Sequence, residues 1–133
     1  MAVAATGRIL VVDDDASVCR ALGRLIRCFG YEVETFGSAA ELLASGPPPD
    51  TLCLVLDVRM PGIGGVELVE QLHAAGRDIP VVFVTAHGTD GLRSLALQGA
   101  PILQKPVSAE QLLAAIEAVT GKPAGLPPRA GPP

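Results

Sequence analysis

The sequence predicts an α/β fold, a doubly wound five-stranded parallel sheet in the order 2-1-3-4-5 with helices on both faces. Short apolar runs alternate with helical patterns along the whole chain. Most of these runs are continuously apolar, which indicates strands buried on both faces, as in a parallel sheet flanked by helices. Parallel strands joined by right-handed crossovers leave few arrangements, and the doubly wound order suits this repeat.

The five expected strands are short runs rich in Val, Ile and Leu. The second, at residues 31–36, alternates polar and apolar side chains, as a half-exposed strand does. The remaining four lie at residues 8–12, 51–56, 79–84 and 101–104.

Helical periodicity predicts the segments between the strands. Ser38 with Glu41, and Ser108 with Gln111, have the spacing of capping boxes that begin two of the helices. Gly30 ends the first helix, the prolines at 47–49 follow the second, and a weak helix is expected at 89–98. The side chains expected to face the core are Val18, Ala21, Leu22, Leu25, Ile26, Phe29, Val66, Val69, Leu72, Leu112, Leu113, Ile116 and Val119.

Composition limits the possible functions. A hydrophobic content of 49% indicates a folded domain, and 3% aromatic residues means that aliphatic side chains must fill its core. The formal charge of −4 with no basic block argues against direct binding of nucleic acid. No apolar run is long enough to span a membrane, and residues 1–7 do not resemble a signal peptide, so we expect no membrane association.

Three segments are expected along the chain: an extension at 1–7, a folded domain at 8–121 and a Pro/Gly-rich tail or linker at 122–133. The cysteines Cys19, Cys28 and Cys53 form no paired motif. They are expected to be reduced, partly buried thiols of a cytoplasmic protein.

Polar residues stand at the ends of four expected strands. Asp13 and Asp14 follow the first strand, Asp57 the third, Thr85 the fourth and Lys105 the fifth. Because the carboxyl ends of parallel strands lie along one edge, where ligands bind, these side chains are expected to converge. Each residue alone has an ordinary structural explanation as a cap or turn, which is the role we expect for Asp15. Their joint occurrence indicates a site.

The charges of this set require a cation. One pair of carboxylates about 4 Å apart costs roughly 4 kcal/mol at an effective dielectric constant of about 20. Lys105 supplies one positive charge, and a hard divalent ion such as Mg²⁺ would supply two more. An aspartate carboxylate can attack phosphorus to form an aspartyl phosphate, a reaction that depends on positioning and charge neutralisation. The Thr85 hydroxyl could then donate to a phosphoryl oxygen.

Four motifs resemble the signature blocks of response-regulator receiver domains of two-component systems. They are Val-Val-Asp-Asp at 11–14, Leu-Asp-Val-Arg-Met-Pro-Gly at 56–62, Val-Thr-Ala-His at 84–87 and Lys-Pro at 105–106. The resemblance covers roughly residues 8–120. Residues 59–61, 64–68 and 85–88 are most similar to receivers of the nitrogen-fixation regulator type.

The resemblance implies a flavodoxin-like receiver fold and a role for each site residue. Asp57 would be the phosphoacceptor, Lys105 its ion-pair partner and Thr85 the switch hydroxyl. Mg²⁺ (or Mn²⁺) would be held by Asp57, by Asp14 directly, by Asp13 through water and by the backbone carbonyl of Arg59. A cis peptide is expected before Pro106.

The resemblance also implies partners. A histidine kinase or phosphotransfer protein would supply the phosphoryl group, and phosphorylation would switch binding to an output protein or a second copy of the chain. Such a domain is a signalling phosphoacceptor rather than an enzyme, although it catalyses its own phosphotransfer and dephosphorylation. Arg59 and His87 are expected to affect the lifetime of the acyl phosphate.

The sequence departs from the family in one region. Ile102 stands where receivers usually carry an aromatic residue, and the stretch between Thr85 and Lys105 is about two residues short. The segment from His87 to Ile102 is therefore expected to be loosely packed.

Two alternatives remain. A phosphorylation-independent pseudo-receiver would lack an acidic residue or the lysine, and none is missing. A phosphatase of the haloacid-dehalogenase type would carry a second aspartate where Arg59 stands.

Overall fold

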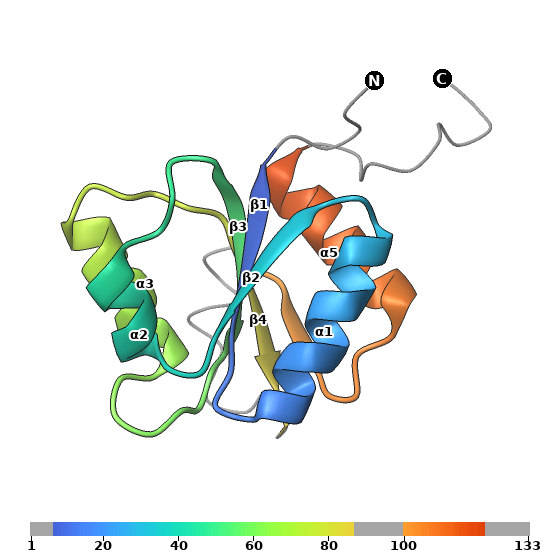
Figure 1. Cartoon of the computed structure of the whole chain (residues 1–133), viewed down its shortest axis with the longest axis horizontal. Helices are drawn as coiled ribbons and strands as arrows, with labels where there is room; N and C mark the ends of the chain where they lie inside the picture. The colour runs from blue at the N-terminus through green and yellow to red at the C-terminus, as the bar shows by residue number, and fades with distance from the viewer. Residues whose placement is uncertain (1–6, 87–99, 122–133) are drawn as a thin grey trace.

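The computed structural model describes residues 7–86 and 100–121. It contains a five-stranded parallel sheet in the order β2-β1-β3-β4-β5, which confirms the predicted fold and strand order (Figure 1). The strands are β1 (Arg8–Val12), β2 (Glu32–Phe36), β3 (Thr51–Asp57), β4 (Val81–Thr85) and β5 (Ile102–Gln104). The described helices are α1 (Ala16–Cys28), α2 (Ala39–Ser45), α3 (Gly65–Ala74) and α5 (Ala109–Thr120).

The sheet separates two apolar cores. Helices α1 and α5 cover one face, and α2 and α3 cover the other (Figure 1). Successive residues of β1 point to opposite faces, so Ile9 and Val11 join the first core while Leu10 and Val12 join the second. All four are fully buried, which explains why the strand is continuously apolar.

Besides β2, which starts at Glu32 rather than Tyr31, two strands begin later than the sequence suggested. β4 starts at Val81 rather than Ile79, and β5 starts at Ile102 rather than Pro101. A proline precedes each strand and has no N–H to donate to the ladder. The carbonyls of Pro80 and Pro101 nevertheless accept hydrogen bonds from Leu54 and Phe83, so both prolines lead directly into the sheet.

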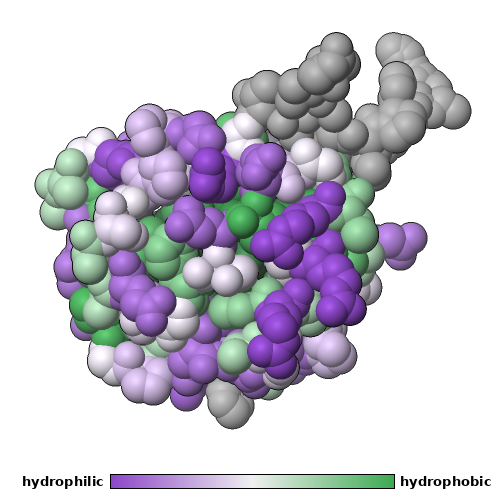
Figure 2. Space-filling model, in the orientation of Figure 1, coloured by the Kyte–Doolittle hydropathy of each residue, from purple (hydrophilic) through white to green (hydrophobic). Residues whose placement is uncertain are grey.

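Helix α1 buries a slightly different face from the one expected. Ala21 is exposed, whereas Cys19 and Gly23 are buried beside Leu22 and Ile26. The outer face carries Arg20, Arg24 and Arg27, and Figure 2 shows hydrophilic side chains over this helix.

The inward face of α3 includes the expected Val66, Val69 and Leu72, but its most buried residue was not expected. Leu68 is fully buried and Leu72 nearly so, whereas Val66 and Val69 are only partly buried. Residues 65, 68 and 72 follow the three- and four-residue spacing of a helix face, which here is centred on Leu68.

The helix starts agree with their expected caps, with one difference. The Asp15 carboxylate accepts from the backbone N–H groups of Ser17 and Val18, and Ser108 with Gln111 forms the expected capping box. Ser38 caps α2, but the Glu41 carboxylate accepts from the N–H of Gly37 rather than from that of Ser38. This pair is therefore not a reciprocal capping box.

The expected helix at 89–98 and the tail at 122–133 lie outside the described residues, as does most of the extension at 1–7. None of the helices in the described part of the chain has the length and apolar character needed to cross a membrane.

The three cysteines are free, but they are not uniformly partly buried as expected: Cys19 and Cys53 are buried and Cys28 is exposed. Burial raises the pKa of Cys53 to about 12. Burial, together with the nearby Asp13 charge, raises the pKa of Cys19.

A thiol reagent should therefore modify Cys28 rapidly in the folded protein and the other two cysteines only after denaturation, because the thiolate is the reactive form. Time-resolved alkylation followed by peptide mass spectrometry measures each site, and Cys28→Ser should remove the fast phase. Equal rates at all three cysteines would contradict the described packing.

Candidate functional site

Three carboxylates meet at the carboxyl edge of the sheet. Asp13 directly follows β1, and Asp57 ends the adjacent strand β3. One carboxylate oxygen from each of Asp13, Asp14 and Asp57 lies within 4.8 Å of the other two. Asp13 and Asp57 are 2% and 7% exposed, whereas Asp14 faces solvent. Two of the three charges are therefore shielded from water, and the third is accessible.

Lys105 enters this cluster from the end of β5. Its backbone N–H donates to the Thr85 carbonyl at 2.8 Å, which holds the start of the lysine segment against the end of β4. The ammonium group lies 2.8 Å from Asp13 Oδ2 and 3.6 Å from Asp57 Oδ2. Lys105 thus bridges both buried carboxylates, but its closer partner is Asp13 rather than the expected Asp57. The expected cis peptide between Lys105 and Pro106 is present.

Lys105 and Asp57 both have displaced pKa values. Burial alone would lower the pKa of Lys105, but its hydrogen bond to Asp13 and the charges of Asp13 and Asp57 outweigh burial and raise that pKa. The Asp57 pKa is also raised, by burial first and by the Asp13 charge second, and Lys105 opposes this rise. One lysine is therefore insufficient to compensate the buried carboxylates.

Backbone donors orient both buried carboxylates. The Arg59 N–H donates to Asp57 Oδ1 at 3.2 Å, and the Asp15 N–H donates to Asp13 Oδ1 at 2.9 Å. Asp15 thus has two roles, as the cap of α1 and as a backbone support for Asp13. The sequence analysis identified only the first, because a backbone donor leaves no residue-type signal.

Thr85 and Arg59 occupy the remaining expected positions. Thr85 is the last residue of β4 and is 1% exposed, and its neighbour Val84 lies opposite Asp57 in the sheet register. Arg59 follows β3 by two residues and its side chain is exposed. His87, the other residue expected to affect acyl phosphate lifetime, lies outside the described residues.

The donor set suits a small divalent cation. With Lys105 protonated, the three carboxylates retain two uncompensated negative charges, which equals the charge of one divalent ion. Mg²⁺ prefers oxygen ligands at about 2.0–2.1 Å and keeps several waters, so opposite ligands lie about 4 Å apart. The 4.8 Å spread of the oxygens fits such an ion if one carboxylate is bound through water. Asp13 suits that outer position, because Lys105 and the Asp15 N–H already occupy its oxygens.

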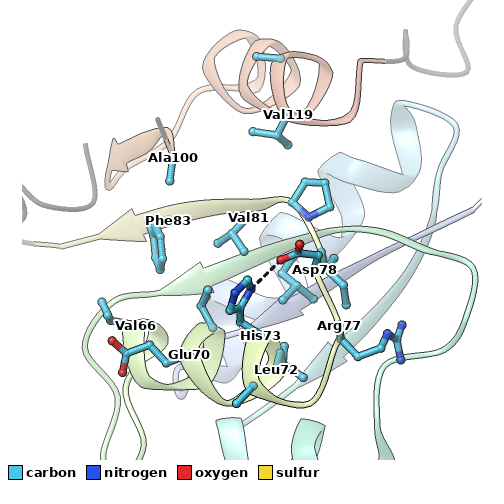
Figure 3. A pocket seen from close by; sticks show the side chains of 16 residues that line it. Val66, Glu70, Leu72, His73, Arg77, Asp78, Val81, Phe83, Ala100 and Val119 are labelled. Carbon is cyan, nitrogen blue, oxygen red and sulfur yellow. Dashed lines mark hydrogen bonds and ion pairs between the residues drawn. The ribbon is translucent and has the colours of Figure 1, made fainter. Parts of the chain in front are cut away.

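A separate cavity lies near the beginning of β4, away from Thr85. It encloses about 730 Å³ and is lined by apolar residues such as Val66, Val81 and Phe83. His73 and Asp78 contribute to its polar rim, where they lie 2.8 Å apart (Figure 3). Asp13, Asp14, Asp57 and Lys105 do not line it. The candidate chemistry therefore belongs to the sheet edge rather than to this cavity.

Comparison with known proteins identifies the family. The family model for the response regulator receiver domain matches residues 9–117. This chain is a response-regulator receiver domain. Receiver domains are signalling phosphoacceptors of two-component systems, in which histidine kinases supply the phosphoryl group, and they bind Mg²⁺ at an acidic pocket. The predicted family and general function are thereby confirmed.

Two curated relatives support the finer resemblance. The receiver domain is 42% identical over 114 residues to Nodulation protein W of Bradyrhizobium diazoefficiens. It is 40% identical over 116 residues to Transcriptional regulatory protein FixJ of Azorhizobium caulinodans, which fits the expected nitrogen-fixation regulator type. The matches cover 84% and 86% of this chain but 50% and 55% of the relatives. The chain thus spans about half the length of the curated relatives that it matches.

Solved structures agree with the fold. The response regulator StyR superposes with a TM-score of 0.79 at 44% identity, covering 88% of this chain and 60% of that one. A response regulator receiver protein from Burkholderia phymatum gives a TM-score of 0.74 at 41% identity, covering 90% and 99%.

The raised Asp57 pKa predicts that Asp57→Asn stabilises the metal-free receiver domain at neutral pH. Above the folded-state pKa, wild-type Asp57 is a buried charge that the asparagine variant lacks, while Lys105 keeps its closer partner Asp13. Below the ordinary carboxyl pKa, near 4, Asp57 is protonated in both folded and unfolded states and the difference should vanish.

Urea unfolding with a chelator at several pH values measures this difference. The gain in free energy of unfolding of Asp57→Asn over wild type should shrink as the pH falls, first through the pKa of Asp57 in the folded protein and then through its pKa in the unfolded chain. A gain that grew towards acid pH would show that the assigned direction of the Asp57 pKa shift is wrong.

Proposed function

We propose that Asp57 is the phosphoacceptor of this receiver domain, and that Asp13, Asp14, Asp57 and the Arg59 carbonyl hold Mg²⁺ or Mn²⁺ beside it. The observation that carries the proposal is the meeting of three carboxylates with Lys105 at the carboxyl ends of neighbouring strands. Asp57 is central to this set, since it is near Lys105 and receives the Arg59 N–H. When bound, the divalent ion neutralises charge on the transferring phosphoryl group.

In the proposed reaction, one Asp57 oxygen attacks the phosphorus of a phosphohistidine on a kinase or phosphotransfer protein. The new O–P bond forms as the N–P bond to the donor imidazole breaks, and the imidazole leaves with the electron pair. Lys105 pairs with the phosphoryl oxygens, and the Thr85 hydroxyl donates to one of them. Water later attacks the same phosphorus, which restores the Asp57 carboxylate and releases inorganic phosphate.

Phosphorylation in this proposal switches binding to an output protein or to a second copy of the chain. Residues 8–121 form the switching domain, residues 1–7 an extension and residues 122–133 a tail or linker. The free cysteines support a reducing, cytoplasmic location, where disulfides are rare.

Incubation with acetyl phosphate and Mg²⁺ should add one phosphoryl group to the wild-type domain and none to Asp57→Asn. The amide is not an anionic nucleophile and cannot form the acyl phosphate. Intact-protein mass spectrometry measures the gain, and Asp78→Asn, an exposed change outside the site, serves as the control. A stable gain of one phosphate in Asp57→Asn would place the acceptor elsewhere.

Asp14→Ala should lower the affinity for Mg²⁺ by at least about tenfold. Removing a residue that only supports a metal ligand already costs about ten- to a hundredfold in affinity, and Asp14 is proposed as a direct ligand. A bound ligand stabilises the folded state, so Mg²⁺ should raise the melting temperature of wild type more than that of the variant. Calorimetric titration gives both affinities directly, with Asp78→Ala as the matched carboxylate deletion. Equal affinities in wild type and Asp14→Ala would exclude Asp14 as a ligand.

A further inference from the structure

Gly65, the first residue of α3, lies against the backbone of the proposed phosphoacceptor. A Cβ atom added at Gly65 would be 2.5 Å from the Asp57 carbonyl oxygen and 3.3 Å from both the Asp57 carbonyl carbon and the Val58 Cα. Real Cβ contacts essentially never fall below 3.0 Å, and all three neighbours are backbone atoms. Any side chain here must therefore displace either the start of α3 or the end of β3.

The requirement for glycine at this position is one of space rather than of backbone torsion. Gly65 does not have a positive φ, so alanine could adopt its backbone conformation. Helix propensity by itself would favour alanine over glycine. The close contact with Asp57 is what opposes the substitution.

This contact closes the loop that carries Arg59. At the beginning of the loop, the Val58 N–H donates to the Val84 carbonyl of β4 at 3.1 Å. At its end, the Gly65 N–H donates back to the Val58 carbonyl at 3.1 Å, and the Gly64 N–H donates to Glu67 Oε1 at 3.1 Å. The start of α3 is thereby held directly against the strand end that presents Asp57.

We propose that Gly65 is a positioning residue that sets the Arg59 carbonyl and the Asp57 carboxylate in the relative geometry that binds the metal. The inference rests on the proposed function of this site. Both groups belong to the segment 57–59, whose first two residues a Cβ at Gly65 would contact. The hydrogen bond from the Arg59 N–H to the Asp57 carboxylate lies within the same segment. A misplacement of roughly 1 Å in such a site can cost about a hundredfold in rate.

The test compares Gly65→Ala with Gly23→Ala, a matched change in α1. A Cβ at Gly23 would meet its nearest neighbours, Thr35, Arg27 and Val33, at 3.5–3.6 Å, which is ordinary contact. Gly65→Ala should lower Mg²⁺ affinity about ten- to a hundredfold and slow phosphorylation by acetyl phosphate. It should also speed amide exchange at Arg59 in the metal-free protein, relative to amides of α1. Gly23→Ala should match wild type in all three measurements.

The outcomes separate the two proposals. Failure of wild type to bind Mg²⁺ or to accept phosphate would refute the proposed function, and Arg59 amide exchange would still report whether Gly65 orders the loop. A folded Gly65→Ala protein with wild-type Mg²⁺ affinity and Arg59 exchange would overturn the positioning role, even if its melting temperature fell.

Should Gly65→Ala fail to fold, Gly64→Ala provides a milder displacement. Its Cβ would lie 3.1 Å from the Val58 carbonyl oxygen, a tight contact that a small shift relieves. It should weaken Mg²⁺ binding less than the change at Gly65 would, but measurably. Unchanged Mg²⁺ affinity and Arg59 exchange in this variant would then overturn the proposal.

Discussion

The electrostatic balance at the carboxyl edge of the sheet is the constraint on which the site depends. Asp13 and Asp57 are almost completely buried side by side, and a single ammonium group, that of Lys105, bridges them. Burial raises the Asp57 pKa, and repulsion from the Asp13 charge, which water cannot screen effectively, raises it further. The resulting deficit of positive charge favours binding of a divalent cation and then of a phosphoryl group that Lys105 can reach.

Apolar packing on both faces of the sheet supports the strands whose ends carry this charge. Each strand contributes side chains to two separate cores, and helices cover both. The strands end together at one edge, where polar residues replace the apolar runs. Burial, which makes the acidic cluster unfavourable in the free state, also strengthens its interaction with an incoming cation. The same apolar packing therefore supports the fold and prepares the site.

Much of the fold and of the site was predictable from the sequence. Apolar runs, capping residues such as Asp15 and Ser108, and the polar residues at the strand ends are local signals that directly reflect burial and hydrogen bonding. Faces were harder to predict. Ala21 lies within the apolar periodicity of α1 and is nevertheless exposed, and Leu68 was overlooked between two valines that are less buried. Periodicity specifies an arc of a helix, whereas contact with the sheet selects the residues within it.

By itself, the sequence determined the family, the alternation of strands and helices and the identities of the acidic residues and lysine at the sheet edge, because these depend on residue type and order along the chain. Only the tertiary structure decided that Lys105 lies closer to Asp13 than to Asp57, and that Gly65 lies against the Asp57 backbone. The physical reason is that such contacts depend on how separate strands and helices pack in space. A distance between residues 13 and 105 has no counterpart in local sequence pattern.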